Sequence, residues 1–195
     1  MKVTSFHILV VVIAMLSYLL YTYLTGGPGN IVFVKSGERY HKVQDLPNKQ
    51  DAADMMETIQ TNLQTIVAHY RKEDYADEPA RLLVERFNPD SISENAVTSS
   101  DTSYSENKGE KIVICLRDKS PPYALVDINT AMFVVLHEMA HLMTTELDSH
   151  KHTRVFWSNF RRLLEDSARV GIYVPTNYSK NPVSYCGMQI TDSPL

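Results

Sequence analysis

The sequence predicts an α+β domain that is mainly helical and has a small sheet, preceded by a single apolar helix. Its 195 residues, 44% of them hydrophobic, are enough for one domain with a core of ordinary density. Several segments repeat apolar residues at spacings of three and four, as amphipathic helices do. Short apolar runs at 31–34 and 111–117 are typical of strands.

The first predicted element is the uncharged apolar run at residues 6–24. Its length is close to the ~20 residues that a helix needs to cross ~30 Å of hydrocarbon. Three aromatic residues suited to a membrane–water interface collect at its C-terminal end: Tyr18, Tyr21 and Tyr23. A cleaved signal peptide, the alternative, has an apolar region of only ~7–15 residues followed by a small-x-small site, which is missing here. We therefore expect a single-pass membrane anchor.

A break in the chain follows this helix at Gly26-Gly27-Pro28-Gly29. We accordingly divide the chain into an anchor with its glycine-rich break, residues 1–29, and one further domain, residues 30–195. The few flanking charges do not determine which side of the membrane this domain faces. The expected location is a membrane, with the orientation left open.

Two helices and a polar segment come next. Apolar spacing predicts an amphipathic helix at about 48–70 and a second one at 78–87, which ends at Asn88-Pro89-Asp90. Residues 91–110 are rich in Ser, Asn, Thr and Glu, which indicates a hairpin or a loop before the strand at 111–117.

Two further helices follow this strand. One begins near Asn129 or Thr130, both acceptable N-caps, and continues to about Thr145. The other runs over 153–169, and Gly171 gives it a natural C-terminal stop. The tail after it contains several prolines and has little periodicity.

Charge and cysteine content exclude some classes of function. A net charge of −4 without a basic stripe argues against a nucleic-acid partner, because affinity for phosphate comes mainly from clustered Lys and Arg. Cys115 and Cys186 are too few for a disulfide framework and are not spaced as a C-x-x-C motif. The two can pair, or Cys115 can be an unpaired buried residue of its apolar strand.

The motif that carries chemistry is His137-Glu138-Met139-Ala140-His141. Positions four apart lie on one face of a helix, so His137 and His141 can present imidazole nitrogens to one Zn²⁺. Glu138 is rotated about a hundred degrees around the helix, which suits a general base that contacts the attacking water. The strongly apolar residues before the motif favour a functional site over incidental surface histidines.

A catalytic zinc site usually has three protein ligands and a water, so a third ligand is required. The candidates follow the motif: Glu146, Asp148, His150, His152, Glu165 and Asp166. Thr144 and Leu147 exclude the metzincin pattern, which needs Gly and His at these positions. His152 is favoured because it directly precedes a helix that begins with Phe156 and Trp157. Glu165, as in a gluzincin, and His150 remain alternatives.

The segment from His137 to His141, together with His152-Thr-Arg-Val-Phe156-Trp157, resembles the WLM/SprT-like group of zinc metallopeptidases. That group has HExxH, a short insert and then His-x-x-x-Phe-Trp, although the insert is longer here. The resemblance implies a zincin-like metallopeptidase domain in which His137, His141 and His152 bind Zn²⁺. It also implies that Phe156 and Trp157 pack behind the metal and fix the position of His152.

We therefore expect a membrane-anchored metallopeptidase that acts on a polypeptide substrate. Zn²⁺ lowers the pKa of a bound water to about 7, and Glu138 removes a proton from it. The alternative is a catalytically inactive, membrane-anchored zinc-binding scaffold protein. Glu138 argues against the alternative, because a structural zinc site does not need a base. Tyr185 is either an oxyanion-stabilising residue or, as we favour, a strand residue packed on the core.

Overall fold

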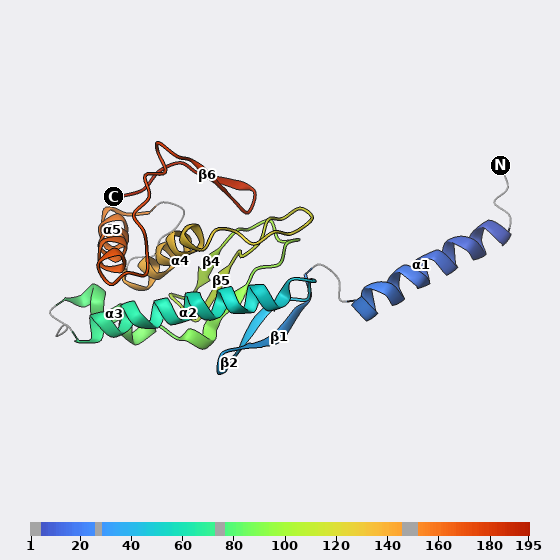
Figure 1. Ribbon diagram of the computed structural model, residues 1–195, viewed down its shortest axis with the longest axis horizontal. Coiled ribbons are helices and arrows are strands. Elements are labelled where there is room, and N and C mark those ends of the chain that lie inside the picture. The colour runs from blue at the N-terminus through green and yellow to red at the C-terminus, as the bar shows by residue number, and fades with distance from the viewer. Residues whose placement is uncertain (1–4, 26–28, 73–76, 146–151) are drawn as a thin grey trace.

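The computed structural model (Figure 1) describes residues 5–25, 29–72, 77–145 and 152–195. Its α-helices are α1 (Ser5–Thr25), α2 (Lys49–Lys72), α3 (Glu78–Arg86), α4 (Ile128–Leu142) and α5 (Arg154–Arg169). Its strands are β1 (Ile31–Ser36), β2 (Arg39–Gln44), β3 (Ile92–Glu94), β4 (Tyr104–Glu106), β5 (Lys111–Ile114), β6 (Val183–Tyr185) and β7 (Met188–Ile190). A short 3-10 turn, η1 (Pro89–Ser91), precedes β3. The fold is therefore α+β, as predicted.

The main sheet has five strands in the order β1-β2-β3-β5-β4. β1 pairs antiparallel with β2, and β2, β3 and β5 are mutually parallel. β4 pairs antiparallel with β5 and forms one edge of the sheet. β6 and β7 form a separate antiparallel hairpin. This sheet is larger than the one that the sequence predicted.

Helices α2 and α4 build the core against this sheet. α2 contacts β1, β2, α3 and α4, while α4 contacts α5 and the strands β4 and β5 (Figure 1). The apolar face of α2 is buried as its spacing predicted: Ala52, Met56, Ile59, Leu63 and Ile66 are each 0% exposed. α4 is buried over most of its surface, because its residues are apolar on nearly every side.

The four helices predicted after residue 30 are confirmed, with a correction at the start of α4. The N-cap is Asp127, whose Oδ1 accepts a hydrogen bond from the Thr130 N–H at 2.9 Å. The predicted caps, Asn129 and Thr130, lie inside the helix. The Asn129 side chain instead holds the C-terminal segment, because it donates to Val174 O at 2.9 Å and accepts from Val174 N–H at 2.8 Å. An aspartate cap was available in the sequence two or three residues earlier than expected.

Several strands were missed because their sequences are polar. β2 contains Arg39 and His41, and both are paired with Glu57 of α2, at 2.7 Å and 2.9 Å respectively. β3 and β4 both lie within the polar segment 91–110, which the sequence assigned to a hairpin or loop. Arg39 and His41 find their partner on a helix 18 and 16 positions away, so polar residues can occupy strand positions and the apolar alternation that marks a strand is weak.

The apolar N-terminal segment forms the expected helix, α1, which lies apart from the rest of the fold (Figure 1). In the described part of the chain, no helix has both the length and the apolar character needed to cross a membrane. The predicted membrane-spanning anchor is therefore not supported by the structure. The membrane location and the division at residue 29 stay predictions.

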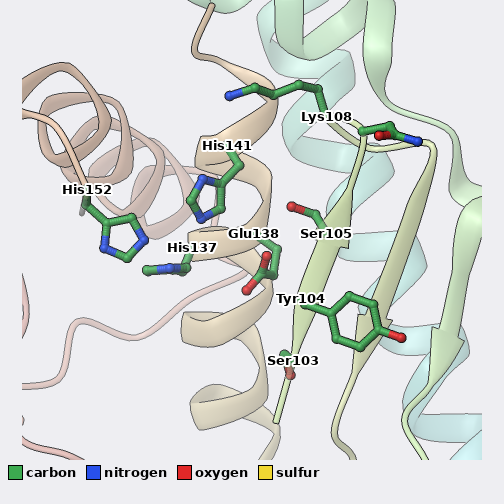
Figure 2. A pocket seen from close by; sticks show the side chains of 9 residues that line it. Ser103, Tyr104, Ser105, Lys108, His137, Glu138, His141 and His152 are labelled. Carbon is green, nitrogen blue, oxygen red and sulfur yellow. The ribbon is translucent and has the colours of Figure 1, made fainter. Parts of the chain in front are cut away.

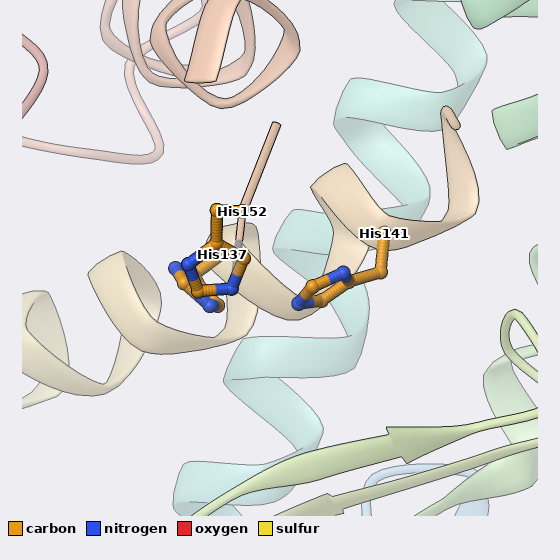
Figure 3. A group of neighbouring side chains, drawn as sticks. All are labelled: His137, His141 and His152. Carbon is orange, nitrogen blue, oxygen red and sulfur yellow. The ribbon is translucent and has the colours of Figure 1, made fainter. Parts of the chain in front are cut away.

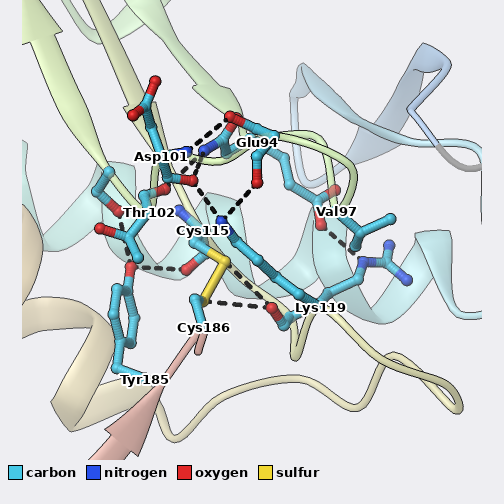
Figure 4. The surroundings of a disulfide bond; sticks show 12 residues. Glu94, Val97, Asp101, Thr102, Cys115, Lys119, Tyr185 and Cys186 are labelled. Carbon is cyan, nitrogen blue, oxygen red and sulfur yellow. Dashed lines mark hydrogen bonds and ion pairs between the residues drawn. A yellow bond between two sulfur atoms is a disulfide. The ribbon is translucent and has the colours of Figure 1, made fainter. Parts of the chain in front are cut away.

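The two cysteines form a disulfide, Cys115–Cys186, with their Cα atoms 6.4 Å apart (Figure 4). The bond joins the residue after β5 to the turn between β6 and β7, across 71 positions of sequence. Cys115 is buried, as expected for its apolar run, but it is paired with Cys186 and is not a free thiol. The disulfide fixes the β6–β7 hairpin to the main sheet.

Candidate metal centre

Helix α4 supplies the first two histidines of the site. His137 and His141 are one turn apart, and their ring centroids are separated by 5.2 Å. Because α4 is packed between α2, α3, α5 and the sheet, the face that carries both imidazoles has a fixed direction. Both rings point into the same cavity (Figure 2).

His152 comes from the short segment before α5 and lines the same cavity as His137 and His141. Its ring centroid lies 4.6 Å from that of His137 and 5.2 Å from that of His141 (Figure 3). The start of α5 is fixed by the N-cap Thr153, whose Oγ1 accepts from the Phe156 N–H at 3.2 Å. The helix cap therefore holds His152 at a defined distance from α4.

These three histidines fit a metal ion. One nitrogen of each lies within 4.8 Å of the nitrogens of the other two. His137 and His141 are half-buried, and His152 is exposed. Three imidazole nitrogens that face an open cavity are the ligand type of catalytic zinc sites, which leave a coordination position for water or substrate. The structure thus brings together the three residues predicted as ligands.

Phe156 forms the floor beneath all three rings. It is fully buried, and its ring centroid lies 4.9 Å from that of His137, 4.5 Å from that of His141 and 4.1 Å from that of His152. The ring of His152 stacks on it at an interplanar angle of 20°. Phe156 therefore packs behind the site, as the resemblance implied. Trp157 also contacts the ring of His152, with centroids 5.4 Å apart, but 44% of its surface is exposed.

Glu138 lies beside the histidines on the wall of a cavity of about 520 Å³ between α4 and β4 (Figure 2). Its side chain is 6% exposed, and burial raises the pKa of its carboxyl group to about 7. Hydrogen bonds from the hydroxyl and backbone N–H of Ser105 act in the opposite direction. A carboxyl group with a pKa near neutrality can both accept and return a proton.

The alternative ligands do not join this group among the described residues. Glu165 lies on α5 and accepts a hydrogen bond from Arg161 Nε at 2.8 Å, with 46% of its side chain exposed. Asp166 accepts from the Tyr70 hydroxyl at 2.6 Å and from Arg169 at 2.8 Å. The other candidates, Glu146, Asp148 and His150, lie outside the described residues.

No family model matches this chain. The chain is 32% identical over 169 residues to Uncharacterized protein R325 of Acanthamoeba polyphaga mimivirus. The aligned residues cover 84% of this chain and 84% of R325. The chain belongs to the R325 family. Uncharacterized protein 136R of Invertebrate iridescent virus 6 is 37% identical over 86 residues, covering 43% of this chain and 44% of the relative.

Among solved structures, this R325-family chain is similar to Wss1 of Saccharomyces cerevisiae. The crystal structure of Wss1 gives a TM-score of 0.45 at 19% sequence identity, covering 66% of this chain and 85% of Wss1. The structure of a Wss1 mutant gives a TM-score of 0.47 at 19% identity, covering 67% and 91%.

The sequence missed the contribution of β4 to the site of this R325-family chain. Ser103, Tyr104 and Ser105 line the cavity opposite α4 (Figure 2). The turn after β4 is pressed against the end of α4: a Cβ at Gly109 would lie 2.9 Å from the Leu142 side chain, and its φ is +103°. The alternating residues Tyr104-Ser-Glu were a weak strand signal within a segment rich in turn residues.

Tyr185 is a core residue, as favoured, and is 0% exposed. Its hydroxyl donates to Cys115 O at 2.8 Å and lies 2.8 Å from Ser103 Oγ (Figure 4). Both contacts hold the buried hydroxyl beside Ser103, which also lines the cavity, and the hydroxyl interacts electrostatically with Glu138. Tyr185 therefore connects the β6–β7 hairpin to the strand that lines the site.

Proposed function

We propose that this protein is a zinc-dependent metallopeptidase that hydrolyses peptide bonds of a polypeptide substrate. The observation that supports it best is the grouping of three imidazole nitrogens within 4.8 Å beside one buried carboxyl group. His137, His141 and His152 would hold the metal, and Glu138 would act as general base. A purely structural zinc site is closed by four ligands and needs no such base.

When bound, Zn²⁺ lowers the pKa of a water ligand and polarises the substrate carbonyl. Glu138 accepts the proton of the attacking water and then delivers it to the nitrogen of the leaving amine. Its burial supports this role, because a pKa of about 7 favours transfer in both directions near neutral pH. Ser105 orients the carboxyl group through its two hydrogen bonds. Phe156 keeps the three imidazoles in position and excludes water from behind them.

The direct test replaces Glu138 by Gln in the full chain loaded with zinc. Cleavage of a mixed peptide library, followed by mass spectrometry, should fall by at least about a hundredfold, in the range typical for loss of a general base. Zinc content should stay near one ion per chain. Glu165→Gln is the matched control, because Glu165 is exposed and bonded to Arg161, and it should cleave normally. Equal rates in both variants would refute the role of Glu138.

The metal ligands are tested by a second pair of variants. His152→Ala should weaken zinc binding strongly, measured by competition with a chromogenic chelator, whereas Glu165→Ala should not. The reverse result would assign the third ligand to Glu165. Removal of zinc with a chelator should abolish cleavage, and added zinc should restore it. A chain that binds one zinc but cleaves no peptide would instead be the inactive zinc-binding scaffold.

A further inference from the structure

A second cavity, of about 370 Å³, borders His137 and is lined by α4, α5 and the C-terminal segment. Its walls are Phe133 of α4, Trp157 and Phe160 of α5, and the C-terminal segment Asp192–Pro194, with His137 at the boundary. We call it the aromatic pocket. In Figure 1 the C-terminal segment passes beside α4 and α5, where this pocket lies.

The pocket is built by the same helices as the metal centre. Phe133 precedes His137 by one turn of α4, so both side chains lie on one face of the helix. Phe133 packs on Phe160 with ring centroids 5.1 Å apart, and both residues are buried. Trp157 follows at 6.2 Å from Phe160 and remains half-exposed at the rim.

The aromatic pocket is also continuous with the catalytic residues. A neighbouring cavity of about 360 Å³ shares Phe133 and His137 with it and extends to Glu138 and His152. Met188 and Ile190 of β7 line its other side. A ligand bound at His137 and Glu138 therefore has an adjoining apolar space within reach.

We propose that the aromatic pocket binds a large apolar side chain of the polypeptide substrate, close to the bond that is cleaved. The proposal rests on the proposed peptidase function and adds a substrate preference to it. A volume of about 370 Å³ is at the lower end of ligand cavities, which suits one side chain rather than a folded partner. Contact with Phe133, Trp157 and Phe160 favours an aromatic or long aliphatic group.

The polar wall of the pocket sharpens this preference. Asp192 lines it, and its Oδ1 accepts a hydrogen bond from the Ser193 N–H at 2.8 Å. A carboxylate at this wall disfavours a second negative charge in a space that is otherwise apolar. Acidic side chains should therefore bind worst, while Phe, Leu and Met should bind best.

Binding can be measured without catalysis, because the chain has one tryptophan and it lies in the pocket. The probes are the peptides acetyl-Gly-Gly-X-Gly-Gly-amide with X as Phe, Leu, Ala or Asp. They are titrated into the full, zinc-loaded Glu138→Gln chain while Trp157 emission is followed. Phe and Leu peptides should change the emission saturably, with dissociation constants about ten- to a hundredfold lower than those of Ala and Asp peptides. Equal affinities for all four peptides would overturn the proposal.

A matched pair of variants locates the binding site. Ser193→Phe places a ring at the pocket wall and should weaken binding of the Phe peptide at least about tenfold, the loss expected when one buried aromatic group is excluded. Ser179→Phe adds the same ring at an exposed turn outside the pocket and should leave binding unchanged. Similar losses in both variants, or in neither, would place the peptide elsewhere.

Cleavage-site mapping separates this proposal from the peptidase function itself. The zinc-loaded wild-type chain should cut a peptide library with large apolar residues enriched at one position next to the cleaved bond. Cleavage without such enrichment would overturn the pocket assignment and leave the peptidase function standing. Selective binding of the Phe peptide without any cleavage would leave the pocket assignment standing and overturn the peptidase function.

Discussion

Reduction of the Cys115–Cys186 disulfide should destabilise the protein by an amount that follows from its position in the chain. The bond closes a loop across 71 positions that contains α4, α5 and all three histidines. The loss of chain entropy in the unfolded state on closing such a loop corresponds to about 4 kcal/mol at 25 °C. For a protein of this size, about 4 kcal/mol lowers the melting temperature by about 10 °C.

The assay is thermal unfolding of the full chain followed by circular dichroism, with and without a phosphine reductant. Both samples contain a chelator, so that zinc binding does not contribute to the difference. The Cys115→Ala/Cys186→Ala variant is the control: it should melt near the reduced wild type and should not respond to reductant. If oxidised and reduced wild type melt within about 2 °C of each other, less than 1 kcal/mol at this size, the loop-entropy estimate is refuted.

Three further substitutions test the supporting structure. Tyr185→Phe should cost about 1–3 kcal/mol, measured by urea unfolding, because Cys115 O loses its buried donor, yet it should spare cleavage. A loss of about a hundredfold in kcat would instead indicate an oxyanion role for Tyr185. Phe156→Leu should weaken zinc binding about ten- to a hundredfold, as loss of a ligand's supporting contacts does, and unchanged affinity would contradict the floor assignment. Arg117→Met should cost about 3–5 kcal/mol by leaving Glu94 buried without its cation, and adding Glu94→Leu should recover most of it.

The sequence predicted helix α4 and its two histidines well because their signal is local. The spacing of His137 and His141 is set by helix geometry, and the apolar residues around them specify a buried helix without any distant partner. Burial of Glu138 and the resulting rise in its pKa depend on β4 packing against α4. Because β4 belongs to a polar segment, this environment was not visible in the sequence.

The position of His152 was predictable for a different reason. No periodicity connects it to α4, but the cap Thr153 and the ring of Phe156 follow within four residues. The cap fixes where α5 begins, and the ring then supports all three imidazoles. A short motif after a variable insert could therefore specify a long-range contact.

The C-terminal segment shows what local signals leave out. Residues after 171 have little periodicity, yet the hairpin β6–β7 is held by the Cys115–Cys186 bond and by the Tyr185 hydroxyl, and both contacts span about seventy positions. Ser103, which bonds to Tyr185, directly precedes β4 and lines the cavity beside the three histidines. Met188 and Ile190 of the same hairpin line the apolar space beside Glu138. The disulfide thus fixes one wall of the proposed substrate site. Its reduction should change which residues are enriched beside the cleaved bond in peptide-library mapping, while the zinc content stays near one ion per chain.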